Sequence, residues 1–208
     1  DENYASFEEL EKRFGWDMEK PVVIFTQHSV STEFDRVSDQ ISPVLEAMRQ
    51  LTEKGVQVIV TYPNNDAGGK KIIQLIENLN SQNLDNLQVY PSVGRYYYHG
   101  ILKYCGKNGA CAGNSSSGIK ETPAFGCPAV NIGSRQDGRL RAGNVIDAGY
   151  NTDEVINAVQ KALYDLSFRK KCEACENPYG AGGTGKKIAQ ILAETDVDLN
   201  LVQKKMTY

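Results

Sequence analysis

The sequence predicts an α/β fold built on a doubly wound, parallel β-sheet. Short apolar runs rich in β-branched residues recur along the chain, and such runs are typical of buried strands. Between them lie longer segments whose apolar residues recur every three or four positions, as in an amphipathic helix. Strands that alternate with helices favour βαβ crossovers, which place helices on both faces of a parallel sheet.

The first predicted strand covers residues 21–26, and the first long helix covers 37–51, with Gly55 ending it. Further strands are expected at 56–60, 87–90, 110–112, 129–132 and 144–146, and further helices at 70–79, 96–104, 118–125, 152–163 and 186–192. The alternation is that of a Rossmann-like sheet, which binds ligands at the carboxyl ends of its strands.

The predicted organisation has three parts. Residues 1–20 form a lead-in helix or linker, because Phe7, Leu10 and Phe14 stand at helical spacing. Residues 21–194 form the Rossmann-like domain, and residues 195–208 form a tail.

The composition narrows the class of protein. A chain of 208 residues can bury a sizeable core, and a formal net charge of -3 indicates no broad basic surface for nucleic acid or an anionic membrane. Five scattered cysteines favour a reducing compartment. No apolar run approaches ~18 residues, and the acidic start resembles no secretory leader. We therefore expect a cytoplasmic protein with neither nucleic acid nor membrane as a partner.

A serine run offers a candidate phosphate site. Gly113-Asn114-Ser115-Ser116-Ser117-Gly118-Ile119-Lys120-Glu121 joins a predicted strand to a predicted helix. Small residues there let backbone N–H groups approach a phosphate, which favours a diphosphate at Ser115, Ser116, Ser117 and Gly118. A plain helix N-cap explains the serines equally well. The carboxylate of Glu121 could accept both hydroxyls of a ribose or merely complement the helix dipole.

Other candidates follow further predicted strands. His28 could exchange a proton or donate to a phosphate, and a structural role is equally consistent. Asp66 lies in a turn that ordinary turn chemistry explains better than ligand binding does. Arg135 lies in a loop on the expected ligand edge, where it could contact a phosphate or sugar.

An aromatic run and a cysteine pair complete the candidates. Tyr96-Tyr97-Tyr98-His99 could stack a nucleobase, although packing of a helix on the sheet explains at least two of the tyrosines. Cys172 and Cys175 form a single Cys-x-x-Cys pair with no second pair to complete a zinc site, so no metal is expected.

Taken together, the motifs resemble the hydrolysing UDP-N-acetylglucosamine 2-epimerases, including those of sialic-acid pathways. The resemblance covers residues 21–194. It rests on Gln27-His28-Ser29-Val30-Ser31-Thr32-Glu33, Pro63 to Gly69, Gly94 to Tyr98, Gly113 to Glu121, Pro128 to Arg139, and Asn177 to Gly180.

The resemblance implies the second half of a two-domain fold like that of B-type glycosyltransferases. An amino-terminal domain, absent here, would supply the carboxylates that handle the sugar C2 proton. The implied reaction eliminates UDP from UDP-N-acetylglucosamine to give a glycal, to which water adds to give N-acetylmannosamine. The chain alone would bind UDP weakly and turn over nothing, and the full-length protein would be a homo-oligomer.

The resemblance also implies individual roles. Ser115 and Ser116 would contact the diphosphate, Glu121 the ribose and Arg135 the nucleotide, while His28 would belong to the catalytic centre. Either Tyr97 or Tyr98 would lie near the uracil, and Tyr97 is taken as the candidate. Neither a metal nor a redox cofactor is implied.

Three questions stay open at this point. The sugar could carry further modifications. The chain could instead be the donor-nucleotide half of a B-type glycosyltransferase, which would pass its sugar to an acceptor. It could also be a non-catalytic module that binds UDP-sugars.

Overall fold

The computed structural model describes residues 3–180 and 182–203. The chain forms two compact units, Asp1–Pro178 and Tyr179–Tyr208. The first unit therefore includes the predicted lead-in segment and ends before the predicted domain boundary at residue 194.

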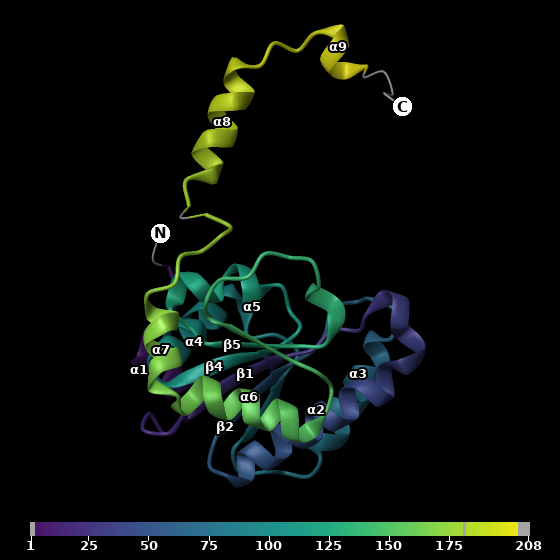
Figure 1. Cartoon of the computed structure of the whole chain (residues 1–208), viewed down its shortest axis with the longest axis vertical. Helices are drawn as coiled ribbons and strands as arrows, with labels where there is room; N and C mark the ends of the chain where they lie inside the picture. The colour runs from purple at the N-terminus through teal and green to yellow at the C-terminus, as the bar shows by residue number, and fades with distance from the viewer. Residues whose placement is uncertain (1–2, 181, 204–208) are drawn as a thin grey trace. The chain divides into compact units, whose positions relative to one another are not determined.

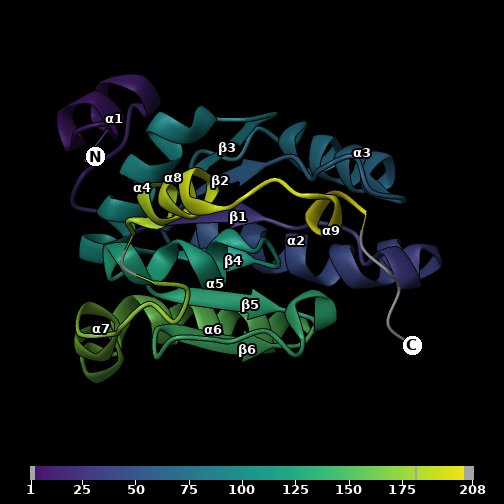
Figure 2. The same ribbon diagram turned by 90° about the horizontal axis from the view of Figure 1, so that it is seen from above.

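The first unit is built on a parallel sheet, and Figure 2 shows its strands side by side. In sheet order the strands are β3 (Leu87–Tyr90), β2 (Gln57–Thr61), β1 (Val22–Thr26), β4 (Gly109–Gly113), β5 (Ala129–Ile132) and β6 (Val145–Ala148). Each neighbouring pair is parallel, which confirms the predicted doubly wound, Rossmann-like fold. The order reverses between β1 and β4, and sheets of this kind bind ligands beyond such a reversal.

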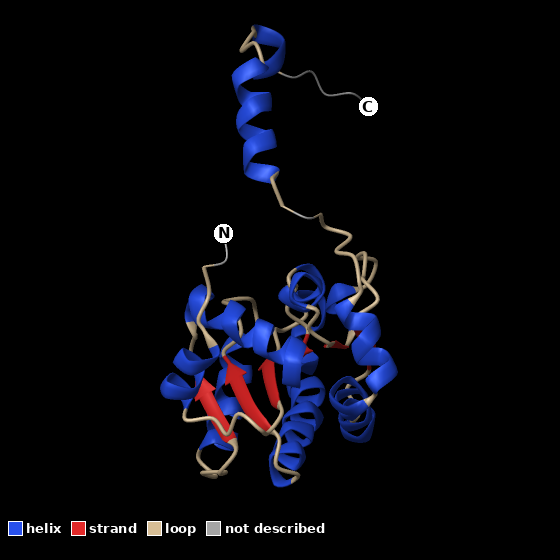
Figure 3. Ribbon diagram, turned by 90° about the vertical axis from the view of Figure 1, so that its left-hand side faces the viewer, coloured by secondary structure: helices blue, strands red, loops and turns tan. Residues whose placement is uncertain are grey.

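Helices cover both faces of the sheet (Figure 1). One core joins the sheet to α2 (Val37–Glu53), α3 (Gly69–Asn80), α6 (Thr152–Tyr164) and α7 (Leu166–Glu173). The opposite core joins it to α1 (Phe7–Phe14) and α4 (Gly94–Asn108). Apolar side chains alternate between the two cores along β1, because successive residues of a strand point to opposite faces. The strand arrows in Figure 3 point toward one edge, where the connecting loops gather.

The segment before the first strand is part of the domain core. Ser6 and Glu9 form a capping box that begins α1. Leu10 and Phe14 on α1 are buried with Trp16 against α4. Residues 3–20 therefore pack within the domain.

The region around α5 and the helix α7 differ from the sequence-based expectation. The predicted helix at 118–125 is divided into α5 (Ser117–Lys120) and a 3-10 turn, η2 (Thr122–Phe125). Pro123 lacks the N–H that a continuous helix needs, and Gly126 ends the turn at φ 58°. Helix α7 was not predicted, because only Phe168 and Cys172 along it are buried.

Two further 3-10 turns follow strands at the carboxyl edge of the sheet. They are η1 (Ser31–Arg36) after β1 and η3 (Ser134–Gln136) after β5.

The second unit contains α8 (Thr184–Glu194) and α9 (Leu199–Val202). Helix α8 contains the predicted helix at 186–192. Its apolar side chains Ile188, Ile191 and Leu192 are exposed. None of the helices in the described ranges is long and apolar enough to span a membrane.

Candidate functional site

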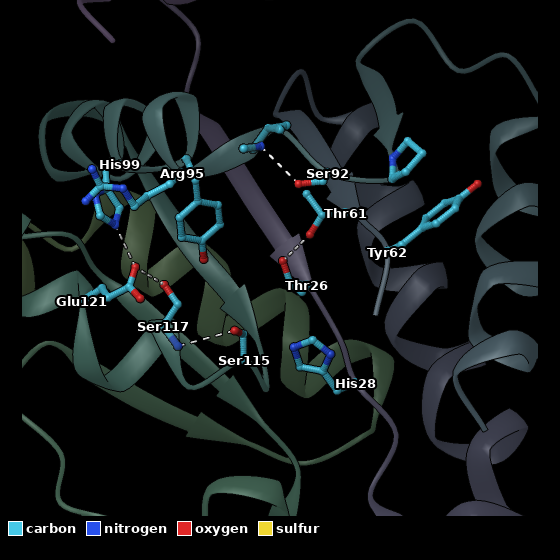
Figure 4. Close-up of a pocket in the computed structure, with 14 residues that line it drawn as sticks. Thr26, His28, Thr61, Tyr62, Ser92, Arg95, His99, Ser115, Ser117 and Glu121 are labelled. Atoms are coloured by element: carbon cyan, nitrogen blue, oxygen red, sulfur yellow. Dashed lines mark hydrogen bonds and ion pairs between the residues drawn. The ribbon is translucent and has the colours of Figure 1, made fainter. Parts of the chain in front are cut away.

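A cavity of about 530 Å³ lies at the carboxyl ends of β1, β2 and β4 (Figure 4). Its volume falls within the ordinary range for sites that bind small molecules. Three segments form its wall: the strand ends, the β3–α4 connection and the serine loop after β4. The lining residues are Thr26, His28, Thr61, Tyr62, Pro91, Ser92, Val93, Gly94, Arg95, Tyr98, His99, Ser115, Ser117 and Glu121.

Hydrogen bonds hold both the backbone and the imidazole of His28 in this cavity. Its backbone N–H donates to Asn114 Oδ1 at 2.7 Å, and its carbonyl accepts from Asn114 Nδ2 at 2.8 Å. Its imidazole Nδ1 accepts the backbone N–H of Asn64 at 2.9 Å. A nitrogen that accepts carries no proton, so we assign the proton of the neutral ring to Nε2.

The surroundings of His28 disfavour its charged form. Burial and the nearby Arg135 guanidinium lower the pKa of His28 to about 4, against a smaller opposing effect of Asp66. The imidazole is therefore uncharged at neutral pH, and its Nε2–H is available as a donor.

Arg135 and Asp66 lie beside His28 and contact each other. The Arg135 guanidinium lies 3.5 Å from an Asp66 carboxylate oxygen. It also donates from Nη1 to the Asn114 carbonyl at 3.2 Å. Asp66 accepts from Asn64 Nδ2 at 2.7 Å, which braces the turn that bonds His28. Asp66 and Arg135 thus form an ion pair beside His28, and all three are residues that the sequence analysis named as site candidates.

The serine loop presents donors to the same region. The backbone N–H of Ser117 approaches Ser115 Oγ at 3.4 Å, and that of Gly118 donates to the Ser115 carbonyl at 3.1 Å. Within the described part of the chain, the N–H groups of Ser115 and Ser116 have no hydrogen-bond acceptor. Because α5 has only four residues, individual N–H groups rather than a long helix dipole would attract an anion.

Glu121 lies at the opposite side of the cavity from His28 (Figure 4). Its Oε2 accepts from Ser117 Oγ and from His99 Nε2, each at 3.1 Å. Ser117 is buried, whereas 44% of the Glu121 side chain is exposed. The carboxylate is therefore fixed by two donors while it still faces solvent.

The structure brings together some of the predicted residues and not others. His28, Ser115, Ser117 and Glu121 line the cavity, whereas Ser116, Gly118, Asp66 and Arg135 do not. Tyr97, the predicted uracil contact, is also absent from the wall, and Tyr98 lines it instead. The ring of Tyr97 packs edge-on against Phe14 with centroids 5.9 Å apart, so the first helix of the chain holds it away from the cavity.

Several residues of this region were given no individual role by the sequence analysis. Thr26 and Thr61 end adjacent strands with their hydroxyl oxygens 2.5 Å apart on the cavity wall. Asn114 is fully buried and also accepts from Gln136 Nε2 through its carbonyl at 2.7 Å. The two threonines could have been found from the sequence, because each stands at the end of a predicted strand or directly after it. The contacts of Asn114 and His99 can be seen only in the tertiary structure.

No group of three or more histidine, cysteine, aspartate or glutamate side chains is arranged to hold a metal ion within residues 3–180 and 182–203. Cys172 is buried on α7, and Cys175 is partly buried.

Residues 1–193 match the sequence profile of a family described as UDP-N-acetylglucosamine 2-epimerase. The chain belongs to the UDP-N-acetylglucosamine 2-epimerase family. This result confirms the resemblance seen in the sequence, and a cavity at the carboxyl edge of a Rossmann-like sheet is compatible with membership of this family.

Named epimerases are among the similar proteins. A UDP-N,N'-diacetylbacillosamine 2-epimerase (hydrolyzing) from Legionella pneumophila is 28% identical over 197 residues, 95% of this chain and 49% of the relative. A GDP/UDP-N,N'-diacetylbacillosamine 2-epimerase (hydrolyzing) from Campylobacter jejuni is 32% identical over 149 residues, 72% of this chain and 38% of the relative. The chain spans about half the length, or less, of these curated epimerases.

A solved epimerase shares the fold. The UDP-GlcNAc 2-epimerase from Neisseria meningitidis, solved bound to UDP-GlcNAc, superposes with a TM-score of 0.73 at 18% identity. The match covers 90% of this chain and 49% of that epimerase chain.

Proposed function

We propose that this chain is the UDP-binding, carboxyl-terminal half of a hydrolysing UDP-N-acetylglucosamine 2-epimerase. The observation that carries the proposal is that His28, the serine loop and Glu121 line one and the same cavity. The family match supports it, and so does the match to about half the length, or less, of the curated relatives.

In the proposed reaction, a base from the other half removes the sugar C2 proton. The C1–O bond then breaks, and its electron pair leaves with UDP to give a glycal. Water next adds its hydroxyl to C1 and a proton to C2 from the opposite face, giving N-acetylmannosamine. This half has the task of stabilising the negative charge that develops on the departing diphosphate.

Three kinds of donor are suited to that task. The N–H groups of Ser115 and Ser116, which have no acceptor among the described residues, can donate hydrogen bonds to a phosphate oxygen. The Arg135 guanidinium supplies positive charge. His28, uncharged and protonated at Nε2, would donate a hydrogen bond to the leaving group without competing for the sugar proton.

At the other side of the cavity, we propose that Glu121 accepts the ribose hydroxyls, as the acidic residue of dinucleotide sites does. The β3–α4 connection and Tyr98 would then lie around the base. Stacking on Tyr98 in place of the predicted Tyr97 follows from which of the two lines the cavity.

The sugar and the partner are also part of the proposal. The named relatives act on diacetylbacillosamine nucleotides, so UDP-N,N'-diacetylbacillosamine should be tested beside UDP-N-acetylglucosamine. The proposed partner is an amino-terminal domain, and the exposed apolar side chains of α8 support further contacts for this chain. We also propose a cytoplasmic homo-oligomer when the protein is full length, in line with five cysteines that are all free thiols.

Calorimetry of the chain with UDP tests the binding site. We expect measurable UDP binding that weakens at least fivefold in Glu121→Ala and in Arg135→Ala, because each removes one proposed contact. Arg139→Ala, an exposed arginine of the same loop, is the matched control and should bind as the wild type does. Unchanged affinity in both site variants would show that the nucleotide binds elsewhere.

The reaction is tested with the full-length protein and the nucleotide sugar as sole substrate. Release of a free 2-epimeric sugar with UDP, in the absence of any acceptor, is the expected result. Turnover that requires an acceptor would instead identify a glycosyltransferase. The 208-residue chain alone is expected to bind UDP without turnover, since the proposed base is not part of it.

A further inference from the structure

His99 and Ser117 bind the same oxygen of Glu121. His99 Nε2 and Ser117 Oγ each lie 3.1 Å from Oε2, and the carboxylate lies between the two donors in Figure 4. A carboxylate can only accept, so His99 carries a proton on Nε2. No donor among the described residues lies within hydrogen-bond distance of the other oxygen, Oε1.

The imidazole of His99 is itself held in place by packing. Its ring lies against that of Phe125 with centroids 5.4 Å apart, and 22% of the side chain is exposed. Phe125 belongs to the 3-10 turn η2 that follows Glu121, whereas His99 belongs to α4. The contact therefore joins α4 to the turn that follows Glu121.

Without His99, one donor would remain on a carboxylate that is 44% exposed. An exposed glutamate samples several rotamers, and ordering it costs conformational entropy when a ligand binds. A side chain already fixed by two donors avoids much of that cost, which is the advantage of preorganisation.

We propose that His99 is a specificity-determining residue for ribonucleotides, because it fixes Oε2 of Glu121 and thereby presents Oε1 to the ribose hydroxyls. The proposal rests on the proposed UDP site and adds to it a residue outside the motifs that indicated the family. His99 acts through Glu121 and is a positioning residue, not a catalytic one.

The test pairs a protein substitution with a ligand change. Calorimetry measures the affinity of the chain for UDP and for 2′,3′-dideoxy-UDP, in the wild type and in His99→Leu. The wild type should prefer UDP by about tenfold, a factor that corresponds to ~1.4 kcal/mol, about the net worth of one hydrogen bond to a charged group. His99→Leu should reduce that preference to twofold or less by weakening the binding of UDP alone.

Two further variants keep the result interpretable. His99→Asn, whose shorter amide does not reach Glu121, should lose the preference for UDP as His99→Leu does. It replaces His99→Leu in the experiment if the leucine variant fails to fold. His99→Gln, which retains an N–H donor of similar reach, should restore most of the preference. In a Glu121→Ala background, His99→Leu should cause no further loss.

The possible outcomes distinguish a failure of the proposed UDP site from a failure of the proposed role of His99. If the wild type fails to bind UDP, the proposed function is wrong. If the wild type binds UDP and the dideoxy analogue equally, Glu121 does not bind the ribose, and the role of His99 falls with it. If His99→Leu weakens both ligands to the same extent, the UDP site stands and His99 has only a structural role.

Discussion

Asn114 and His28 bind each other through two reciprocal hydrogen bonds. The His28 N–H donates to Asn114 Oδ1 at 2.7 Å, and Asn114 Nδ2 donates to the His28 carbonyl at 2.8 Å. The amide side chain thus takes the place of a backbone pairing just beyond the ends of β1 and β4. Its own carbonyl binds Arg135 and Gln136, so one buried residue joins three loops of the candidate site.

Asn114→Ala should lower the free energy of unfolding by about 2–3 kcal/mol, because it removes both partners of the His28 backbone in a buried setting. Urea denaturation at neutral pH measures the effect. Asn65→Ala, at an exposed turn position, is the control and should change stability by less than ~0.5 kcal/mol. A similarly small loss in Asn114→Ala would mean that water replaces the amide without cost.

The stability of the chain should decrease as the pH falls from about 6.5 to about 4. The pKa of His28 is lowered from 6.5 to about 4 in the folded protein, chiefly by burial. Between these values the unfolded chain binds more protons, so acid favours unfolding, and the full contribution is present above pH 6.5. His28→Asn, which cannot titrate, should show a shallower loss in urea denaturation over this range. Parallel pH profiles for the two proteins would contradict the assignment.

Two substitutions beside His28 should move its pKa in opposite directions. Arg135→Gln removes a positive charge and should raise the pKa of His28, whereas Asp66→Asn removes a negative charge and should lower it. The chain has only two histidines, so imidazole signals in an NMR titration are readily assigned by comparison with a His99 variant. Shifts of the same sign in both variants would show that structural change, not charge, controls the titration.

The sequence predicted the fold well because strand and helix patterns are local. The apolar runs that became β1 and β2 are buried along their whole length. The loops after parallel strands gather at one edge whatever the details of the fold, and for this reason His28 and Ser115 could be placed near each other in advance.

The sequence left undetermined those details of the site that depend on tertiary packing. Tyr97 and Tyr98 are neighbours on α4, and which of them faces the cavity depends on how that helix is rotated about its axis. Packing of Phe14 against Tyr97 fixes the rotation, and the sequence does not show that α1 packs there. The partners of Asn114 lie 86 residues away at His28 and 22 residues away at Gln136, so no local pattern could reveal them.

Tyr97 and Tyr98 should therefore respond differently to substitution. Tyr97→Ala should lower the free energy of unfolding by about 2–4 kcal/mol through loss of its contacts in the core, while UDP affinity stays within twofold. Tyr98→Leu retains much of the apolar contact and should weaken UDP binding severalfold, because an aromatic wall of the cavity is lost. Calorimetry and thermal unfolding separate the two effects. Weaker binding in Tyr97→Ala alone would restore the uracil contact predicted from the sequence.

Gly113 should tolerate no side chain. It ends β4 at φ +116°, and a Cβ there would lie 2.0 Å from the carbonyl oxygen of Thr26 on the neighbouring strand. Gly113→Ala should therefore destabilise the chain by more than ~3 kcal/mol, because both the backbone conformation and the close approach of β1 and β4 are lost.

Gly138→Ala provides the matched comparison for this prediction. Gly138 also has a positive φ, +75°, but a Cβ added there would meet no atom within 4 Å. Its substitution should cost only the ~1–2 kcal/mol of the left-handed backbone. Chemical denaturation of the two variants thus separates the steric contact from the backbone strain. Equal losses would show that the contact between Gly113 and Thr26 relaxes freely, and that the serine loop does not depend on it for its position.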